Sequence, residues 1–152
     1  MKKLAVVLLL PLAAAVACSK EAPPTPIPAP VTAPATTLPA PVSVAGVTLG
    51  KSVGADKKVA AALDAFGAKD TIYASVDTVG TGHAKLRALW SFVKRAKTVK
   101  VDETAIEFDS AAPATNEFHI SKPSGWPKGD YKVEIFLGDG ATPAMTKSFK
   151  VG

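Results

Sequence analysis

The stretch 126–140 constrains the fold of this chain more than any other segment. Apolar residues recur there at every second position, at Tyr131, Val133, Ile135 and Leu137. Because charged residues alternate with them, the pattern is typical of a β-strand with one buried and one solvated face. Pro127 and Gly129 interrupt the chain before this strand, and Gly138-Asp139-Gly140 supplies a turn after it. The segment therefore predicts a strand in a half-solvated sheet.

Similar short segments recur through residues 43–152, separated by turn residues. The expected strands and their inward-facing residues are 45–50 with Ala45, Val47 and Leu49; 71–76 with Ile72, Ala74 and Val76; 85–92 with Leu86, Ala88, Trp90 and Phe92; 104–108; 116–121 with Phe118 and Ile120; and 146–151. So many short strands with turn signals between them predict an all-β sandwich of seven to eight strands. A domain of this length can bury a core without a metal or a disulfide.

Two aromatic residues in these strands resemble landmarks of the immunoglobulin-like sandwich. Trp90 is placed like the buried tryptophan of its third strand. Tyr131 follows a Pro-x-Gly turn, as in the tyrosine corner, where the hydroxyl bonds an upstream backbone group. The disulfide cysteines of antibody domains have no counterpart, and the resemblance implies that Val133 and either Ala74 or Val76 fill their places. The expected fold is therefore an immunoglobulin-like β-sandwich.

Residues 43–152 also resemble the immunoglobulin-like C-terminal domains of proteobacterial lipoproteins. The resemblance rests on segments 70–76, 118–123 and 125–131. The last of these contains Trp126, which is expected to be structural, like Trp90 and Tyr131. The resemblance implies a fold and a location but no activity, because such sandwiches serve many unrelated functions.

Residues 57–66 fit two patterns. Their apolar residues have helical spacing, and Asp56 and Gly67 would cap such a helix. Alternatively, residues 59–62 form a strand that is hairpinned with the preceding strand. We favour the strand, because residues 66–73, Phe-Gly-Ala-Lys-Asp-Thr-Ile-Tyr, resemble the segment that leads into the second strand of many bacterial immunoglobulin-like modules.

Residues 1–17 are expected to be a lipoprotein signal peptide. Met1-Lys2-Lys3 is a short basic start, and the apolar run at 4–17 is too short to cross a bilayer core that needs about 20 residues. Ala15-Val16-Ala17-Cys18 resembles the lipobox of bacterial lipoproteins, although alanine replaces the commoner leucine at its first position. This resemblance implies that Cys18 receives acyl chains such as palmitate and becomes the N-terminus. Cleavage by the ordinary signal peptidase, which would give a secreted soluble protein, is the alternative.

Segment 18–42 is expected to be the lipidated cysteine followed by a disordered Pro/Ala/Thr-rich linker. It holds eight of the 13 prolines and almost no charge. Proline favours an extended polyproline II spacer, and residues 21–42 reach at most ~70 Å in this form. By resemblance to the lipoprotein sorting rule, Ser19 in the place of Asp favours the outer membrane. The expected location is the cell envelope, lipid-anchored in the inner leaflet of the outer membrane and facing the periplasm.

The charge and the cysteine count exclude some partners and bonds. The net charge of +5 falls to +3 once Lys2 and Lys3 leave with the signal peptide. This excess is too small to favour nucleic acid as a partner. Cys18 is the only cysteine, so an intramolecular disulfide is excluded even in an oxidising compartment.

No pattern in the sequence predicts catalysis or a cofactor. His83, expected in a turn, and His119, expected on the outer face of a strand, have no ligands nearby at metal-binding spacing. The sequence also lacks a Gly-x-Ser-x-Gly elbow, a paired acid/base spacing of carboxylates and a Gly-rich phosphate loop. No catalytic residue, metal or cofactor is therefore expected.

The most distinctive cluster outside the expected core is basic and consists of Lys94, Arg95, Lys97 and Lys100. One interpretation is a solvated edge, where lysines discourage strand addition. The other is a contact for anionic partners such as lipid headgroups, lipopolysaccharide or glycan phosphates. Phe136 lies on the expected solvent side of its strand, where it either covers a loop or marks a small recognition patch.

The leading functional hypothesis is a non-enzymatic binding or scaffolding module, tethered to the membrane at Cys18. Its partner would be an envelope protein or an anionic glycan or lipid. One alternative is a periplasmic envelope enzyme or metal carrier that uses His83 or His119. Another is a surface adhesion module. The enzyme or metal-carrier hypothesis requires a functional histidine, whereas the hypothesis of an anionic partner requires an accessible basic cluster.

Overall fold

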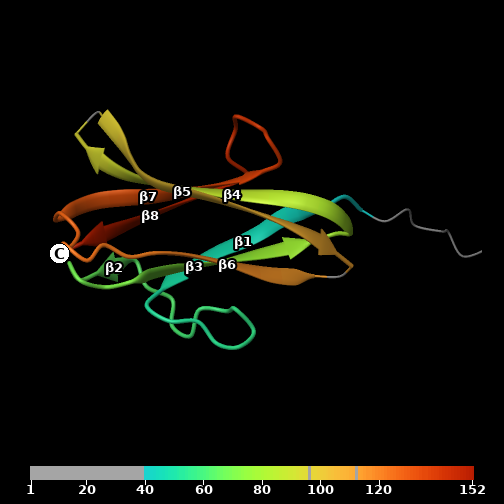
Figure 1. Ribbon diagram of the computed structural model, residues 1–152, viewed down its shortest axis with the longest axis horizontal. Helices are drawn as coiled ribbons and strands as arrows, with labels where there is room; N and C mark the ends of the chain where they lie inside the picture. Colours follow the sequence, from blue (N-terminus) through green and yellow to red (C-terminus); the bar gives the residue numbers. More distant parts are fainter. Residues whose placement is uncertain (1–39, 96, 112) are drawn as a thin grey trace, which may run out of the picture. The chain divides into compact units, whose positions relative to one another are not determined.

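The computed structural model describes residues 40–95, 97–111 and 113–152, whose regular elements are all β-strands (Figure 1). The signal peptide, Cys18 and most of the linker lie outside the described residues. The strands are β1 Ser43–Gly50, β2 Ala65–Phe66, β3 Ile72–Val79, β4 Gly82–Lys94, β5 Lys97–Ser110, β6 Ala114–Ile120, β7 Gly129–Leu137 and β8 Met145–Val151. The described residues include no helix with the length and apolarity that a membrane span requires.

The strands form two sheets. One contains β1, β3 and β6, and the other contains β2, β8, β7, β4 and β5, each in that order. The short β2 pairs in parallel with β8, whereas the longer strands pair antiparallel. In immunoglobulin domains the strands A, B and E share one sheet and C, F and G the other. Because β1, β3 and β6 match the first set and β4, β7 and β8 the second, the fold is the expected immunoglobulin-like β-sandwich.

The core lies between the two sheets and confirms the alternation predicted for their central strands. The completely buried apolar side chains are Ile72, Ala74 and Val76 of β3, Leu86, Ala88 and Trp90 of β4, and Val133 and Ile135 of β7. Phe92 and Leu137, at strand ends, are half-buried and pack against this core. Apolar contacts between the sheets thus occupy the region where antibody domains place a disulfide.

The turn before β7 is held by side-chain hydrogen bonds to backbone carbonyls. The Tyr131 hydroxyl donates to the Pro127 carbonyl at 2.8 Å, which is the geometry of a tyrosine corner. The Trp126 indole donates through Nε1 to the Asp70 carbonyl at 2.9 Å. The Tyr131 ring also stacks on Phe149 of β8, with the ring centroids 5.4 Å apart. These contacts tie the β6–β7 connection to both sheets.

β1 departs from the expected alternation at Ala45. Its register with β3 shifts between Val44 and Gly46, so Ala45 is an extra residue in a β-bulge. Ala45 is exposed, while Val44 and Val47 pack toward the core on either side of it. The prediction that Ala45 faces inward is wrong, because the extra residue reverses the facing of the residues before it.

Residues 51–64 form neither the helix nor the hairpin considered from the sequence. A single antiparallel bridge joins Val53 to Val59, and only Ala65–Phe66 is a strand, β2. The residues with helical spacing do not share a buried face, because Phe66 is 4% exposed and Leu63 is 37% exposed. The loop lies over the outer side of β3, where the buried Ser75 hydroxyl donates to the Lys57 carbonyl at 2.6 Å.

β4 and β5 form a hairpin that is longer than expected. β4 begins at Gly82, so His83 lies in a strand and not in the predicted turn. β5 is one continuous strand. It contains Lys97 and Lys100 of the basic cluster as well as the predicted strand at 104–108. A register shift opposite Trp90 and Ser91 leaves Val101 without a partner on β4. This bulge reverses which residues face inward along β5. The sequence therefore does not show one continuous alternation over the whole strand.

Candidate functional site

The two histidines lie on different sheets, each beside one carboxylate. In β4, Nδ1 of His83 is 3.0 Å from an oxygen of Asp109, and both side chains are exposed. In β6, Nδ1 of His119 is 2.8 Å from an oxygen of Glu117. Among residues 40–95, 97–111 and 113–152, no group of three or more His, Cys, Asp or Glu is placed to hold a metal ion. Each histidine is thus half of a surface pair.

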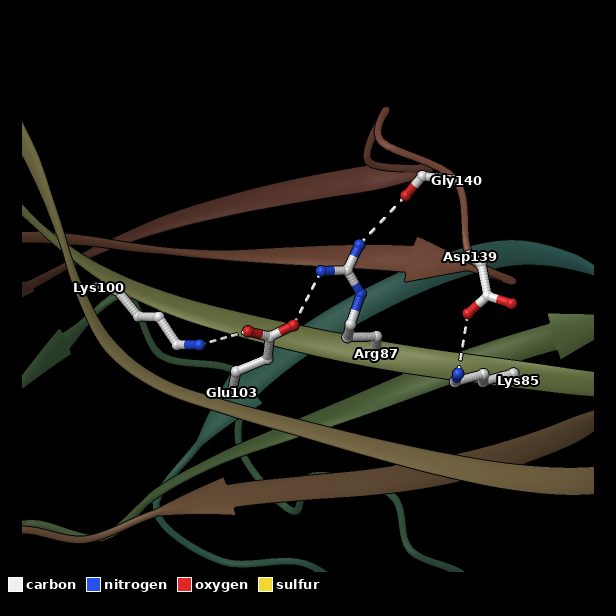
Figure 2. A network of polar contacts seen from close by, with 6 residues as sticks. All are labelled: Lys85, Arg87, Lys100, Glu103, Asp139 and Gly140. Carbon is white, nitrogen blue, oxygen red and sulfur yellow. Dashed lines mark hydrogen bonds and ion pairs between the residues drawn. The ribbon is translucent and has the colours of Figure 1, made fainter.

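The outer face of the five-stranded sheet carries a polar network that sequence reasoning missed (Figure 2). Arg87 of β4 lies at its centre, with Nη1 2.8 Å from Glu103 Oε1 on β5 and Nη2 donating to the Gly140 carbonyl at 3.1 Å. The other oxygen of Glu103 accepts a hydrogen bond from Lys100. We call the following residues the outer network: Lys85, Arg87, Lys100, Glu103, Asp139 and Gly140.

The outer network joins three segments that are far apart in the sequence. Figure 2 shows Glu103 between Lys100 and Arg87, and Asp139 above Lys85 at the far end of β4. The Lys85 ammonium lies 2.8 Å from an Asp139 oxygen. The loop after β7 is therefore bound to β4 by both Arg87 and Lys85.

Phe136 is on the outer face of β7, as expected, but it is only 6% exposed. The Arg87 guanidinium lies over its ring, 4.1 Å from the centroid, in a cation–π contact. The two residues meet because Arg87 and Phe136 are directly paired in the β4–β7 register. Phe136 is therefore covered by the outer network and offers no open recognition patch.

The cations of the outer network keep its carboxylates ionised. Hydrogen bonds from Arg87 and then Lys100 lower the pKa of Glu103 from 4.5 to about 2. The hydrogen bond from Lys85 lowers the pKa of Asp139 below its usual value. A general acid at neutral pH needs a raised carboxyl pKa, which is the opposite shift. The outer network is suited to holding β4, β5 and the loop after β7 together, and it is not suited to proton transfer.

A substitution of Glu103 should weaken the acid sensitivity of the fold. The folded-state pKa of Glu103 is depressed, so its stabilising contribution is complete above about pH 4.5 and is lost as the pH falls toward 2. In Glu103→Gln, melting temperature measured from pH 7 to pH 2 should fall less steeply within this window. Asp102→Asn, which removes an exposed carboxylate of the same strand outside the network, is the matched control. An unchanged slope in Glu103→Gln would contradict the role given to the network.

The structure separates the four basic residues of the predicted cluster into two groups. Lys94 and Lys97 face each other across the end of the β4–β5 hairpin, with Arg95 in the turn between them at φ 56°. All three are exposed, and with Val99 they line a surface hollow of about 470 Å³. Lys100 instead belongs to the outer network. We call Lys94, Arg95 and Lys97 the basic hairpin tip.

The start of the described chain lies at the other end of the sandwich. Thr81, in the turn between β3 and β4, donates a backbone hydrogen bond to the Ala40 carbonyl at 2.9 Å. Gly80 allows this approach, because its φ is +96° and a Cβ there would collide with the Pro41 carbonyl. In Figure 1 the start of β1 and the β4–β5 hairpin lie at opposite ends of the domain. The basic hairpin tip is therefore remote from Ala40, where the described chain begins.

Comparisons with known proteins add a structural likeness and no function. No protein-family model matches the chain, and no curated protein matches it. A similar solved structure is the crystal structure of an immunoglobulin-like protein from Pseudomonas aeruginosa, with 18% sequence identity and a TM-score of 0.48. That match covers 74% of this chain and 98% of the other.

Proposed function

We propose that this protein is a lipid-tethered, non-enzymatic binding module of the cell envelope, which contacts a phosphate-bearing anionic partner through its basic hairpin tip. The tether would be Cys18, on the resemblance of residues 15–18 to a lipobox, anchored in the inner leaflet of the outer membrane. One observation carries the binding role. Lys94, Arg95 and Lys97 have no carboxylate partner in the part of the chain that the structure describes.

The contrast with most other cations of the same sheet supports this role. Lys85, Arg87, Lys100 and Lys132 each lie within ion-pair distance of a carboxylate. At the basic hairpin tip, by contrast, three cations stand within four residues around an open hollow. Like charges held together repel one another, and an anion placed between them relieves that repulsion. A phosphate group bound at the tip would therefore gain attraction to three cations and relieve the repulsion between them.

The chemistry of the partner follows from charge and from reach. A lipid headgroup and a phosphorylated glycan present the same group to the tip. A linker that spans up to ~70 Å lets the tip meet either the anchoring membrane or a layer beyond it. The non-enzymatic part of the proposal rests on the lowered carboxyl pKa values of Glu103 and Asp139 and on the separation of the histidines.

Binding should depend on the tip and weaken with salt. The full chain carrying Cys18→Ser, which removes any contribution from acyl chains, is titrated with mixed phosphatidylcholine–phosphatidylglycerol vesicles and, separately, with deacylated lipopolysaccharide. Replacing Lys94, Arg95 and Lys97 by Gln should lower affinity roughly 100-fold at low salt, since each cation near an anionic surface contributes about 1 kcal/mol. The variant should also lose most of the salt dependence.

The matched control changes the same number of charges elsewhere. Lys57, Lys58 and Lys147 are exposed and lie outside the β4–β5 hairpin and the segment that pairs with its end, so their replacement by Gln should leave most of the affinity. Binding of vesicles alone identifies a headgroup, and binding of the deacylated glycan identifies a glycan phosphate. Equal losses in the tip and control variants would reduce the effect to net charge and reject the tip as the site.

A further inference from the structure

Among the residues that the structure describes, no strand pairs with the side of β5 that faces away from β4, from Lys97 to Asp109, and this is the longest unpaired edge of the five-stranded sheet. β5 is the last strand on its side of that sheet and runs for 14 residues. Most of its side chains are exposed, and Val99 is 53% exposed. A long edge strand presents unpaired N–H and C=O groups that can add another strand. The charges and the bulge of β5 indicate which strand can pair with this edge.

The basic and the acidic residues of β5 lie in separate parts of the strand. Its first four residues carry Lys97 and Lys100 and no acid. The remaining part carries four acids and no base, at Asp102, Glu103, Glu107 and Asp109. A second copy of β5 placed in parallel would align like charges, whereas an antiparallel copy aligns opposite charges. The strand is therefore complementary to itself in one direction only.

The bulge at Val101 selects a register for this antiparallel pair. Outside the bulge, Val99 and Phe108 share the inner face, opposite Phe92 and Ala84 of β4. Lys100 and Glu107 share the outer face, opposite Ser91 and Lys85. Because directly opposed residues must lie on the same face, Lys100 can pair with Glu107 and Val99 with Phe108 when Val101 is skipped on each strand. Counting inward from these pairs places a two-fold axis at Thr104.

We propose that two copies of this chain associate through their β5 edges, antiparallel and with the two-fold axis at Thr104. The arrangement joins the two five-stranded sheets into one continuous sheet. Val99 packs on Phe108 of the second copy on the inner face, and Lys100 meets Glu107 of the second copy on the outer face. Such a contact is isologous, so each pairing occurs twice. The register places Lys97 opposite Ser110 of the second copy and leaves Lys94 and Arg95 outside the paired strands, so self-association can be tested without the anionic partner.

Charge reversal tests the partner and the direction together. Sedimentation equilibrium is run on the full chain carrying Cys18→Ser. Lys100→Glu alone and Glu107→Lys alone should each weaken self-association at least about tenfold, because two attractions become two repulsions. An equimolar mixture of the two variants should recover association as a heterodimer. Lys147→Glu on β8 is the control for net charge and should associate like the parent chain.

A cysteine probe tests the axis without relying on affinity. In the Cys18→Ser chain, Thr104→Cys should form an intermolecular disulfide on mild oxidation, because the two Cα atoms fall within disulfide range. Thr98→Cys should not, because the register separates its two copies by about 34 Å along the strands. A parent chain that stays monomeric at millimolar concentration, a mixture that fails to recover, or equal crosslinking at both positions would each overturn the proposal. If the parent chain stays monomeric and an unrelated extended peptide pairs with the β5 edge instead, the proposal is overturned as well.

Discussion

Trp90→Ala is expected to leave the domain marginal or unfolded. The indole is completely buried on β4 and meets the Phe149 ring edge-on, with centroids 6.0 Å apart. Removing a whole aromatic side chain from a packed core costs ~3–5 kcal/mol, while a domain holds only ~5–15 kcal/mol in total. Urea denaturation followed by circular dichroism measures the loss. Trp90→Phe should cost less, since the buried Nε1 has no hydrogen-bond acceptor among the described residues.

Two further variants calibrate this result. Tyr131→Phe keeps the ring on Phe149 but removes the donor to the Pro127 carbonyl, which should cost ~1–3 kcal/mol. Lys132→Ala changes an outward side chain of the same strand and should cost less than ~0.5 kcal/mol. If Trp90→Ala were as harmless as Lys132→Ala, the packing between the sheets would not be the main source of stability.

Cys18→Ser is expected to abolish the membrane attachment that resists high salt. Acyl chains contribute about 0.8 kcal/mol for each buried CH₂ group, and two or more chains give a stable anchor where one is marginal. The remaining contact, through the basic hairpin tip, is electrostatic and should be removed by high salt. Labelled palmitate should therefore enter the wild-type chain and not the variant, and after a high-salt wash only the wild type should stay with membranes.

The control for this experiment keeps the thiol. Ser19→Ala leaves Cys18 in place and should retain both the label and the attachment. Wild-type protein that is recovered unlabelled in the soluble fraction would contradict the tether and favour cleavage by the ordinary signal peptidase. N-terminal mass analysis separates the two outcomes, because only lipidation adds the mass of acyl chains at Cys18.

The central strands were predictable because each keeps one facing along most of its length. Buried and half-buried residues alternate without interruption from 86 to 90 in β4 and from 131 to 135 in β7, and Ile72, Ala74 and Val76 of β3 are all buried. Ala45 and Val101 were not predictable, because a bulge adds one residue and so reverses a period-two pattern. Residues 51–64 have an alanine-rich composition that fits several structures, and their position is set by contacts such as the one between Ser75 and Lys57.

The candidate site was only partly predictable, for a related reason. The basic hairpin tip is local in the sequence, so its charge could be recognised directly. Lys100 could not be separated from it, because its partner Glu103 also contacts Arg87, 16 residues earlier in the chain. Likewise, the burial of Phe136 depends on the strand register that places Arg87 beside it. Knowledge of which strands pair, and in which register, would have revealed both contacts.

The start of the described chain and the basic hairpin tip lie at opposite ends of the sandwich, which has a mechanical consequence. A pull between an anchored linker and a partner held at the tip would run along the strands. Hydrogen bonds in an antiparallel pair lie across the strands, so those joining β1 to β3 between Ser43 and Gly50 would be loaded in shear, all together. They would not be opened one after another, as they would be if both forces acted at the same end. Under such a pull, β1 would resist extension of the domain.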